Sequence, residues 1–146
     1  MRPPPTRVGE TFTLTLRLSD DEIRGFARQL HDLNPLHHDL AAAHAAGYPG
    51  LTASGAHTGA IFMGMTATHF SAAAPDGGAR SVLGLGFDIR FRAVVLADED
   101  ITLRWTVTAS AWKPSLDGYV TQCDGVAHTP RGEVLAGSAN LLLRHR

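Results

Sequence analysis

Nine residues, HDLNPLHHD from His31 to Asp39, hold the densest group of side chains in this chain that can do acid–base chemistry. They contain three of its eight histidines and two aspartates, arranged around an Asn-Pro pair. Proline fixes one backbone angle, so the loop is stiff enough to hold a carboxylate and an imidazole at a set separation. Asp32 and His37 are therefore candidates for general acid–base work on one shared water, to which such groups contribute about 10²–10⁴-fold each.

Two other interpretations of this segment stay open from the residues alone. Asn-Pro commonly starts a turn and Asp commonly caps a helix, so the segment is also consistent with a polar loop without chemistry. His37, His38 and Asp39 carry ligand-type atoms, but adjacent residues in an extended segment point apart, and no second cluster has metal-ligand spacing. We therefore expect no metal. The other histidines are treated by default as surface or satisfied core residues: His31, His44, His69, His128 and His145.

A second candidate feature is Ser54-Gly55-Ala56, which opens a segment that is apolar on nearly all sides. From Thr52 to His69 there is no charged residue, histidine being taken as neutral, and such a helix is predicted to be buried. A helix N-terminus presents free N–H groups and the positive end of a dipole, and Gly55 lets a ligand approach the backbone closely. This helix start is therefore a candidate oxyanion hole for a carbonyl oxygen that gains negative charge.

The periodicity of the N-terminal third predicts a strand and two helices that hold the candidate loop. From Thr11 the chain alternates apolar and polar residues, as a half-buried strand does. Ser19–Glu22 has the form of a capping box, and the apolar residues after it follow helical spacing. This helix should stop near His31, because residues before proline avoid helical angles. A short second helix over 40–46, capped by Asp39, should follow.

The second half of the chain predicts four strands joined as hairpins, over 82–92, 101–112, 119–129 and 133–144. The order strand, helices, then strands predicts an α+β domain, an antiparallel sheet with one helix on its face. Gly59 and Gly64 in that helix each cost about 1 kcal/mol relative to Ala, which predicts close approach of another backbone. Three consecutive prolines predict a flexible arm over residues 1–9, before a single domain over 10–146.

Composition and charge exclude several classes of protein. The 146 residues suit one domain, and a formal net charge of −1 leaves no broad basic field for nucleic acid. The only cysteine, Cys123, forms no internal disulfide, which gives secretion no support. The N-terminus lacks the apolar core of a signal peptide, and no apolar run is long enough to span a membrane. We expect a cytoplasmic protein that contacts neither membrane nor nucleic acid.

These motifs resemble the MaoC-like dehydratases, the family of the (R)-specific enoyl-CoA hydratases. The run from Phe26 to Gly55 carries Asp-x-Asn-Pro-x-His, a short Ala-rich helix, a Gly-aromatic turn and a glycine that opens the central helix. The stretch from Gly84 to Ala109 is similar to the family's strand pair with an acidic turn. The resemblance extends from Val8 to the last residue. It implies a hotdog fold, in which an antiparallel sheet wraps around a buried central helix.

The resemblance also implies an activity in acyl-CoA and fatty acid metabolism. Asp32 and His37 would bind and activate water for its syn addition to a trans-2-enoyl thioester, giving the (R)-3-hydroxyacyl product. The Gly55 N–H would polarise the thioester carbonyl, and Asn34 would support the loop or orient the pair. No cofactor is implied beyond the thioester carrier, CoA or an acyl carrier protein. A homodimer or larger homo-oligomer is implied, with the acyl-CoA pocket near the subunit interface.

The start of the central helix departs from the commonest family pattern, His-Gly-Met. Ala53 to Thr58 instead matches Ala-Ser-Gly-x-His-Thr, the pattern of a subset, and Met63 stands where some members carry a pocket serine. Ser54 and His57 are thus further candidates for substrate binding, although packing or capping is equally open for His57. A hotdog thioesterase and a non-catalytic acyl-thioester binding module remain alternatives, because the same carbonyl clamp suits all three.

Overall fold

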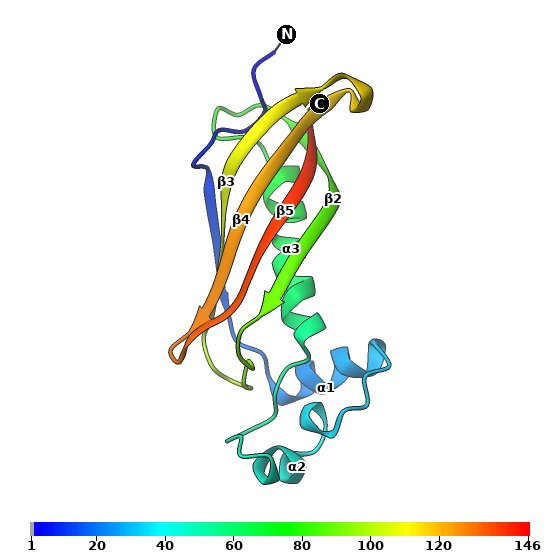
Figure 1. The fold of residues 1–146 in the computed structure, drawn as a ribbon, viewed down its shortest axis with the longest axis vertical. Coiled ribbons are helices and arrows are strands. Elements are labelled where there is room, and N and C mark those ends of the chain that lie inside the picture. Colours follow the sequence, from blue (N-terminus) through cyan, green and yellow to red (C-terminus); the bar gives the residue numbers. More distant parts are fainter. Residues whose placement is uncertain (1) are drawn as a thin grey trace.

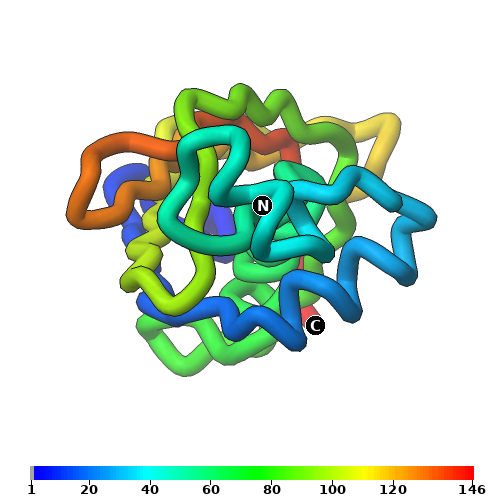
Figure 2. Tube along the Cα trace, turned by 90° about the horizontal axis from the view of Figure 1, so that it is seen from below, coloured from blue at the N-terminus to red at the C-terminus, as the bar shows by residue number. Residues whose placement is uncertain are grey.

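The computed structural model describes residues 2–146, which form one curved sheet around a long helix. Its strands are β1 (Thr11–Leu16), β2 (Arg80–Phe91), β3 (Ile101–Lys113), β4 (Gly118–Thr129) and β5 (Gly132–His145). They are all antiparallel, in the order β1-β3-β4-β5-β2. Its helices are α1 (Asp20–Gln29), α2 (Leu40–Ala45) and α3 (Gly55–Ser71), with short 3₁₀ turns η1 (Pro35–His37) and η2 (Pro114–Leu116). The sheet wraps α3 (Figure 1), and α1, α2 and their linking segments cover one end (Figure 2).

The helix starts predicted from capping residues are confirmed for α1 and α2. The hydroxyl of Ser19 accepts the Glu22 N–H at 3.1 Å, and the Glu22 carboxylate accepts the Ser19 N–H at 3.2 Å. Asp39 caps α2 by accepting two N–H groups of its first turn. After α1, His31 adopts a left-handed φ of 58°, which ends the helix and redirects the chain.

The central helix begins at Gly55 with Ser54 as its N-cap residue, which confirms the predicted start at Ser54-Gly55-Ala56. Thr52 forms an isolated bridge with Leu96, and the Ala53 N–H donates to the Val95 carbonyl at 2.8 Å. These residues are held in extended conformation by a segment more than forty positions away in the chain. Local periodicity carries no information about such a contact, so the apolar segment includes two residues, Thr52 and Ala53, that lie before the helix and its N-cap.

The core lies between α3 and the concave face of the sheet. Trp105 of β3 is fully buried and stacks on Phe62 of α3, with ring centroids 4.0 Å apart. Its indole N–H donates to the Phe62 carbonyl at 2.8 Å, which fixes the helix on the sheet. The Cys123 side chain is buried in the same core, and desolvation raises the pKa of its thiol to about 12.

The glycines that permit close contact between helix and sheet lie in the sheet. A Cβ at Gly64 would meet no atom within 4 Å, and a Cβ at Gly59 would make only ordinary side-chain contacts. The predicted backbone approach at these two helical glycines is therefore wrong. A Cβ at Gly125 of β4 would instead overlap the Phe62 ring, and one at Gly137 of β5 would lie 3.3 Å from it. The sheet glycines leave the space that the Phe62 ring fills.

Two apolar surfaces remain exposed on the single chain. The first is the outer face of α3, so the prediction that this helix is buried on nearly all sides holds for only part of its surface; the exposed face comprises Ala56, Ala60, Met63, Gly64 and Ala67. The second is the edge strand β2, where Leu83 and Leu85 are 58% and 47% exposed. Within residues 2–146, no helix combines the length and the apolar character needed to cross a membrane.

The described part of the N-terminal segment is docked on the domain. Pro5 and Thr6 are buried, although the sequence predicts a flexible arm there. Arg80, 1% exposed, donates to the Pro5 carbonyl at 3.2 Å and to the Glu10 carboxylate at 2.9 Å. Glu10 also accepts a hydrogen bond from the Thr6 hydroxyl. The expected arm is corrected at these positions, because a buried guanidinium needs the acceptors that the segment supplies.

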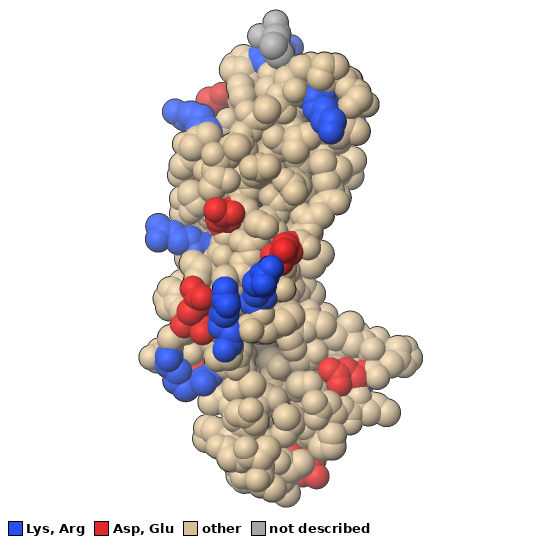
Figure 3. All heavy atoms as spheres, in the orientation of Figure 1, with Lys and Arg blue, Asp and Glu red and all other residues tan. Residues whose placement is uncertain are grey.

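Charged side chains of both signs lie close together on the face shown in Figure 3. Several arginines of the described chain pair with carboxylates, among them Arg17 with Asp100 at 2.7 Å and Arg131 with Glu99 at 2.6 Å. Paired charges give little long-range field, because each cation is neutralised locally. This face therefore offers no broad basic surface of the kind that holds nucleic acid.

Candidate active site

Asp32 and His37 come together beside the N-terminus of α3. Nε2 of His37 lies 3.2 Å from Oδ2 of Asp32. Nδ1 of the same ring lies 2.6 Å from the Thr52 carbonyl, which accepts only, so Nδ1 carries a proton and donates it there. This contact leaves Nε2 facing the carboxylate. The imidazole is almost fully buried, whereas the Asp32 side chain is 31% exposed, so the pair sits where a small molecule can reach it.

Three hydrogen bonds hold the loop that carries the pair. Oδ1 of Asp32 accepts the Asn34 N–H at 3.1 Å. The Asn34 side chain accepts the Leu36 N–H at 3.1 Å and so caps η1. Nε2 of His38 donates to the Asp32 carbonyl at 2.7 Å. Asn34 thus supports the loop from both its backbone and its side chain, and His38 acts on the backbone of Asp32.

The pKa of Asp32 lies below the ordinary value of an aspartate. The hydrogen bond from the Asn34 N–H is the largest cause and outweighs the opposing effect of desolvation. Charge on His37 and a hydrogen bond from the Ser54 hydroxyl lower the pKa further. Asp32 is consequently ionised at neutral pH and acts as a hydrogen-bond acceptor for whatever occupies the space beside it.

The start of α3 provides hydrogen-bond donors next to this pair. Ser54 is the N-cap residue of α3, but its buried side chain does not cap the helix. Among the described residues, the N–H groups of Gly55 and Ala56 have no acceptor. Free N–H groups at a helix start attract negative charge. The structure therefore brings a carboxylate, an imidazole and two backbone donors to one place.

A cavity of about 380 Å³ lies against His37 and Gly55, next to Asp32. Its lining includes Asn34, His37, Gly55 and Thr58 from the predicted site and α3. Phe91, at the end of β2, covers the helix start, since a Cβ at Gly55 would lie 3.1 Å from its ring. Any side chain at position 55 would thus press on this ring, and glycine keeps the N–H accessible.

His57 points away from this cavity, toward α1. Its ring is 6% exposed and stacks on Phe26, with centroids 4.2 Å apart and planes 4° from parallel. Nδ1 is buried and has no hydrogen-bond partner among the described residues. Desolvation lowers the pKa of this imidazole, which favours the neutral ring. Of the two roles left open for His57, the geometry matches packing. Met63 likewise lies on the exposed outer face of α3, outside the cavity.

Sequence reasoning missed the part of the site that non-local contacts supply. Phe91 and residues 92–95 line the cavity, and the Thr52 carbonyl fixes the tautomer of His37. The apolar run after Phe91 is visible in the sequence, but its position against α3 depends on the pairing of Ala53 with Val95. Among residues 2–146, no three His, Cys, Asp or Glu side chains gather as metal ligands.

The chain matches the family model described as "MaoC like domain" over residues 3–122. The (R)-hydratase from A. caviae involved in PHA biosynthesis has a TM-score of 0.78 at 23% identity, covering 93% of this chain and 96% of that one. A MaoC-like dehydratase from Rhodospirillum rubrum has a TM-score of 0.75 at 27% identity, covering 96% and 94%.

One curated relative also matches, over a shorter stretch. The mitochondrial 3-hydroxyacyl-[acyl-carrier-protein] dehydratase FERN of Solanum lycopersicum is 30% identical over 67 residues, which is 46% of this chain. This chain spans less than half of that relative, since the match covers 41% of its length. The solved structures establish the hotdog fold, and the family match covers most of the sequence. The chain therefore belongs to the MaoC-like domain family.

Proposed function

We propose that this protein adds water to a trans-2-enoyl-CoA, or removes it from the (R)-3-hydroxyacyl thioester. The observation that carries the proposal is the Asp32–His37 contact of 3.2 Å at the start of α3, where two N–H groups are free. An acid–base pair beside a carbonyl clamp suits addition and elimination next to a carbonyl. Membership of the MaoC-like family, with its dehydratases and hydratases, supports an enzyme of the hydro-lyase kind.

In the proposed reaction, water binds between the carboxylate of Asp32 and Nε2 of His37. Asp32 takes a proton from the water as the oxygen bonds to C3, and Nε2–H of His37 gives a proton to C2. Water is thereby added across the double bond, and a proton passed from Asp32 to His37 over their 3.2 Å contact restores the pair. Because both groups lie side by side, they address one face of the double bond, which gives syn addition.

The thioester carbonyl is proposed to bind at the start of α3. Negative charge develops on this oxygen while C2 is protonated, and the free N–H of Gly55 is placed to stabilise it. Nδ1 of His37 stays bonded to the Thr52 carbonyl throughout, so only Nε2 exchanges its proton with substrate. No cofactor is needed, since every proton in the cycle comes from water or from these two side chains.

We also propose that the active protein is a homodimer formed through β2 and the outer face of α3. β2 is an edge strand of 12 residues with two exposed leucines, whereas the other edge strand, β1, has 6 residues. A long apolar edge is a template for pairing with another strand. Phe91 at the end of β2 lines the catalytic cavity, so this pairing would bring the partner close to the substrate.

The test is the loss of enoyl-thioester absorbance with crotonyl-CoA. Asp32→Asn and His37→Gln should each lower kcat by about 10²–10⁴-fold while the protein stays folded. Asp124→Asn, an exposed aspartate on β4, is the matched control and should keep full activity. Full activity in Asp32→Asn would overturn the proposal. Release of CoA from a saturated acyl-CoA would favour a thioesterase, and thermal stabilisation by acyl-CoA without turnover would favour a binding module.

A further inference from the structure

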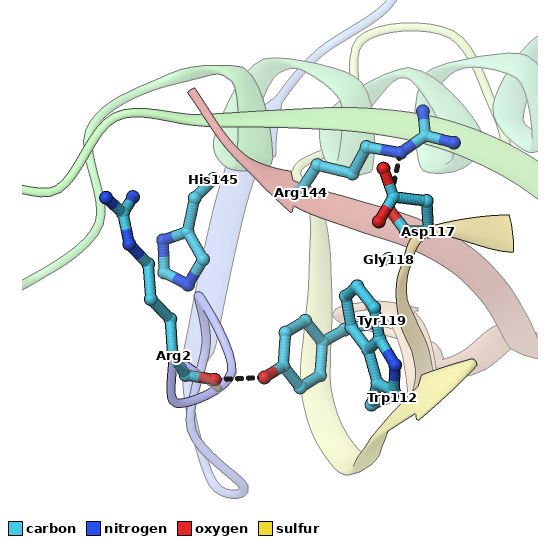
Figure 4. A pocket seen from close by; sticks show the side chains of 7 residues that line it. All are labelled: Arg2, Trp112, Asp117, Gly118, Tyr119, Arg144 and His145. Carbon is cyan, nitrogen blue, oxygen red and sulfur yellow. Dashed lines mark hydrogen bonds between the residues drawn. The ribbon is translucent and has the colours of Figure 1, made fainter. Parts of the chain in front are cut away.

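A second cavity lies at the end of the molecule opposite to Asp32 and His37, where both chain ends meet (Figure 1). Its volume is about 560 Å³, larger than the 380 Å³ of the catalytic cavity. The length of α3, 17 residues or roughly 25 Å, separates the two ends. The second cavity is lined by Arg2, Trp112, Asp117, Gly118, Tyr119, Arg144 and His145 (Figure 4). The proposed hydratase reaction uses none of these residues.

One wall of this cavity is aromatic. Trp112, at the end of β3, is 40% exposed, which is unusual for so large an apolar side chain. Tyr119, at the start of β4, packs against it edge to face, with centroids 5.3 Å apart and planes at 66°. The Tyr119 ring is buried and holds the indole in one orientation. A partly open indole of fixed orientation is a stacking surface for a planar ring.

The facing wall is held in place by side-chain hydrogen bonds. The Tyr119 hydroxyl donates to the Arg2 carbonyl, and Nε2 of His145 donates to the Pro3 carbonyl at 2.8 Å. Figure 4 shows Arg2 and His145 across the cavity from Tyr119 and Trp112. Both bonds use backbone carbonyls, so the Arg2 guanidinium remains available. The cavity is thus formed before any ligand arrives, which lowers the entropy cost of binding.

The rim of the cavity carries an excess of positive charge. Arg144 donates from Nε to the Asp117 carbonyl at 2.9 Å and from Nη2 to the Leu116 carbonyl at 2.7 Å, which fixes its guanidinium. Among the described residues, neither Arg144 nor Arg2 forms an ion pair with a carboxylate. Asp117 is the single acidic residue of the lining. Guanidinium groups without a carboxylate partner are suited to phosphate.

We propose that this cavity binds a nucleotide. The base stacks on Trp112, and the phosphate pairs with the guanidinium of Arg2 on the facing wall. The same chemistry, a planar base joined to phosphate, is found in a free nucleotide and in the nucleotide end of coenzyme A. The site is separate from the catalytic pair, and its occupancy does not depend on the proposed hydratase activity.

Titration of the intact protein with ADP, followed by calorimetry and by tryptophan fluorescence, tests the proposal. Trp105 is fully buried, so a fluorescence change on binding reports on Trp112. Saturable binding is expected, and Arg2→Gln should weaken it about 10- to 100-fold, the effect of losing one charge-assisted hydrogen bond. Arg2 contacts the fold through its carbonyl, so this variant should stay folded. Arg104→Gln, an exposed arginine elsewhere on β3, is the control and should bind normally.

Further binding experiments identify what the second cavity recognises. Adenosine and inorganic phosphate should each bind more weakly than ADP, and Trp112→Ala should lose affinity for ADP. Asp32→Asn should bind ADP as the wild type does, which separates this site from catalysis. A raised KM for crotonyl-CoA in Arg2→Gln identifies the ligand as the end of coenzyme A, and an unchanged KM identifies a free nucleotide. Absence of saturable ADP binding overturns the proposal. So does wild-type affinity for ADP in both Arg2→Gln and Trp112→Ala.

Discussion

At the scale of residues, the position of one proton decides what Asp32 and His37 can do. The Thr52 carbonyl holds the proton of Nδ1, so a neutral His37 presents an acceptor to a carboxylate 3.2 Å away. Two acceptors at that distance repel each other unless a proton or a water lies between them. A proton between the two groups gives either an imidazolium beside a carboxylate or a neutral imidazole beside a carboxylic acid, and the proposed reaction passes from the first of these states to the second and back.

His57 provides a test of packing against catalysis at the same scale. His57→Phe keeps the stack on Phe26 and removes the buried Nδ1 that lacks a partner among the described residues. An unsatisfied buried polar atom costs about 1–3 kcal/mol, and the variant avoids this cost. We expect the free energy of unfolding in urea to rise by about 1 kcal/mol, with kcat and KM unchanged. His57→Ala, which loses the ring, should be less stable than the wild type. A large fall in kcat for His57→Phe would return this residue to the active site.

At the scale of elements, two glycines predict opposite effects of the same substitution. Gly125→Ala in β4 places a Cβ against the Phe62 ring and 2.5 Å from the Trp105 ring, so overpacking should cost about 1–3 kcal/mol or more. Gly25→Ala in α1 meets no atom within 4 Å and should add about 1 kcal/mol of helix propensity. Thermal unfolding of the two variants measures the difference. Equal shifts in unfolding temperature would contradict the described contact between α3 and the sheet.

The success of sequence reasoning differs between elements for a physical reason. The β3 prediction of 101–112 agrees closely with Ile101–Lys113, because one face of this strand is buried and alternation records that burial. The Asp32–His37 pair was predictable because both residues lie in one short, stiff loop. Thr52, Ser54 and Phe91 reach the pair only through folding, and their roles leave no local pattern. The prediction of a close backbone approach at Gly59 and Gly64 failed for the same reason, because the sequence does not show which residues pack against them.

At the scale of the whole molecule, Glu10 links the N-terminal segment to α3 and β2. Burial raises its pKa, but hydrogen bonds from Thr6, His69 and Arg80 outweigh that effect, and its pKa lies below the ordinary 4.5. A lowered pKa stabilises the fold above the unfolded value, and this contribution disappears as pH falls through the folded pKa. Unfolding measured from neutral pH downward past 4.5 should show this loss, and Glu10→Gln should show less of it.

Removing the Glu10 side chain should be costly at neutral pH. Glu10→Ala leaves Arg80, 1% exposed, as a buried charge without its carboxylate, and such losses cost about 3–5 kcal/mol. Asp100→Asn is the control, because its ion pair with Arg17 is exposed and should contribute little to stability. Similar stability losses in both variants, measured by urea unfolding, would show that the Glu10 network contributes no more than a surface pair.

The free edge of β2 predicts the assembly state. Leu85→Lys places a charge on the apolar edge, so the variant should sediment as a monomer, whereas the wild type should sediment as a dimer. Leu14→Lys makes the same change on the other edge strand, β1, where Leu14 is 39% exposed, and should leave the dimer intact. A monomeric wild type, or dissociation caused by Leu14→Lys alone, would exclude pairing through β2.

The rate at which the buried Cys123 thiol is modified reports how often the sheet opens. Thiols react as thiolates, and this one has a pKa of about 12 and no exposed surface, so a disulfide reagent should modify it only in molecules whose sheet has opened. A ligand that binds only the closed form slows that modification by the factor 1 + [L]/Kd. The labelling rate with ADP or with an enoyl-CoA would therefore measure the occupancy of either cavity without any enzymatic turnover.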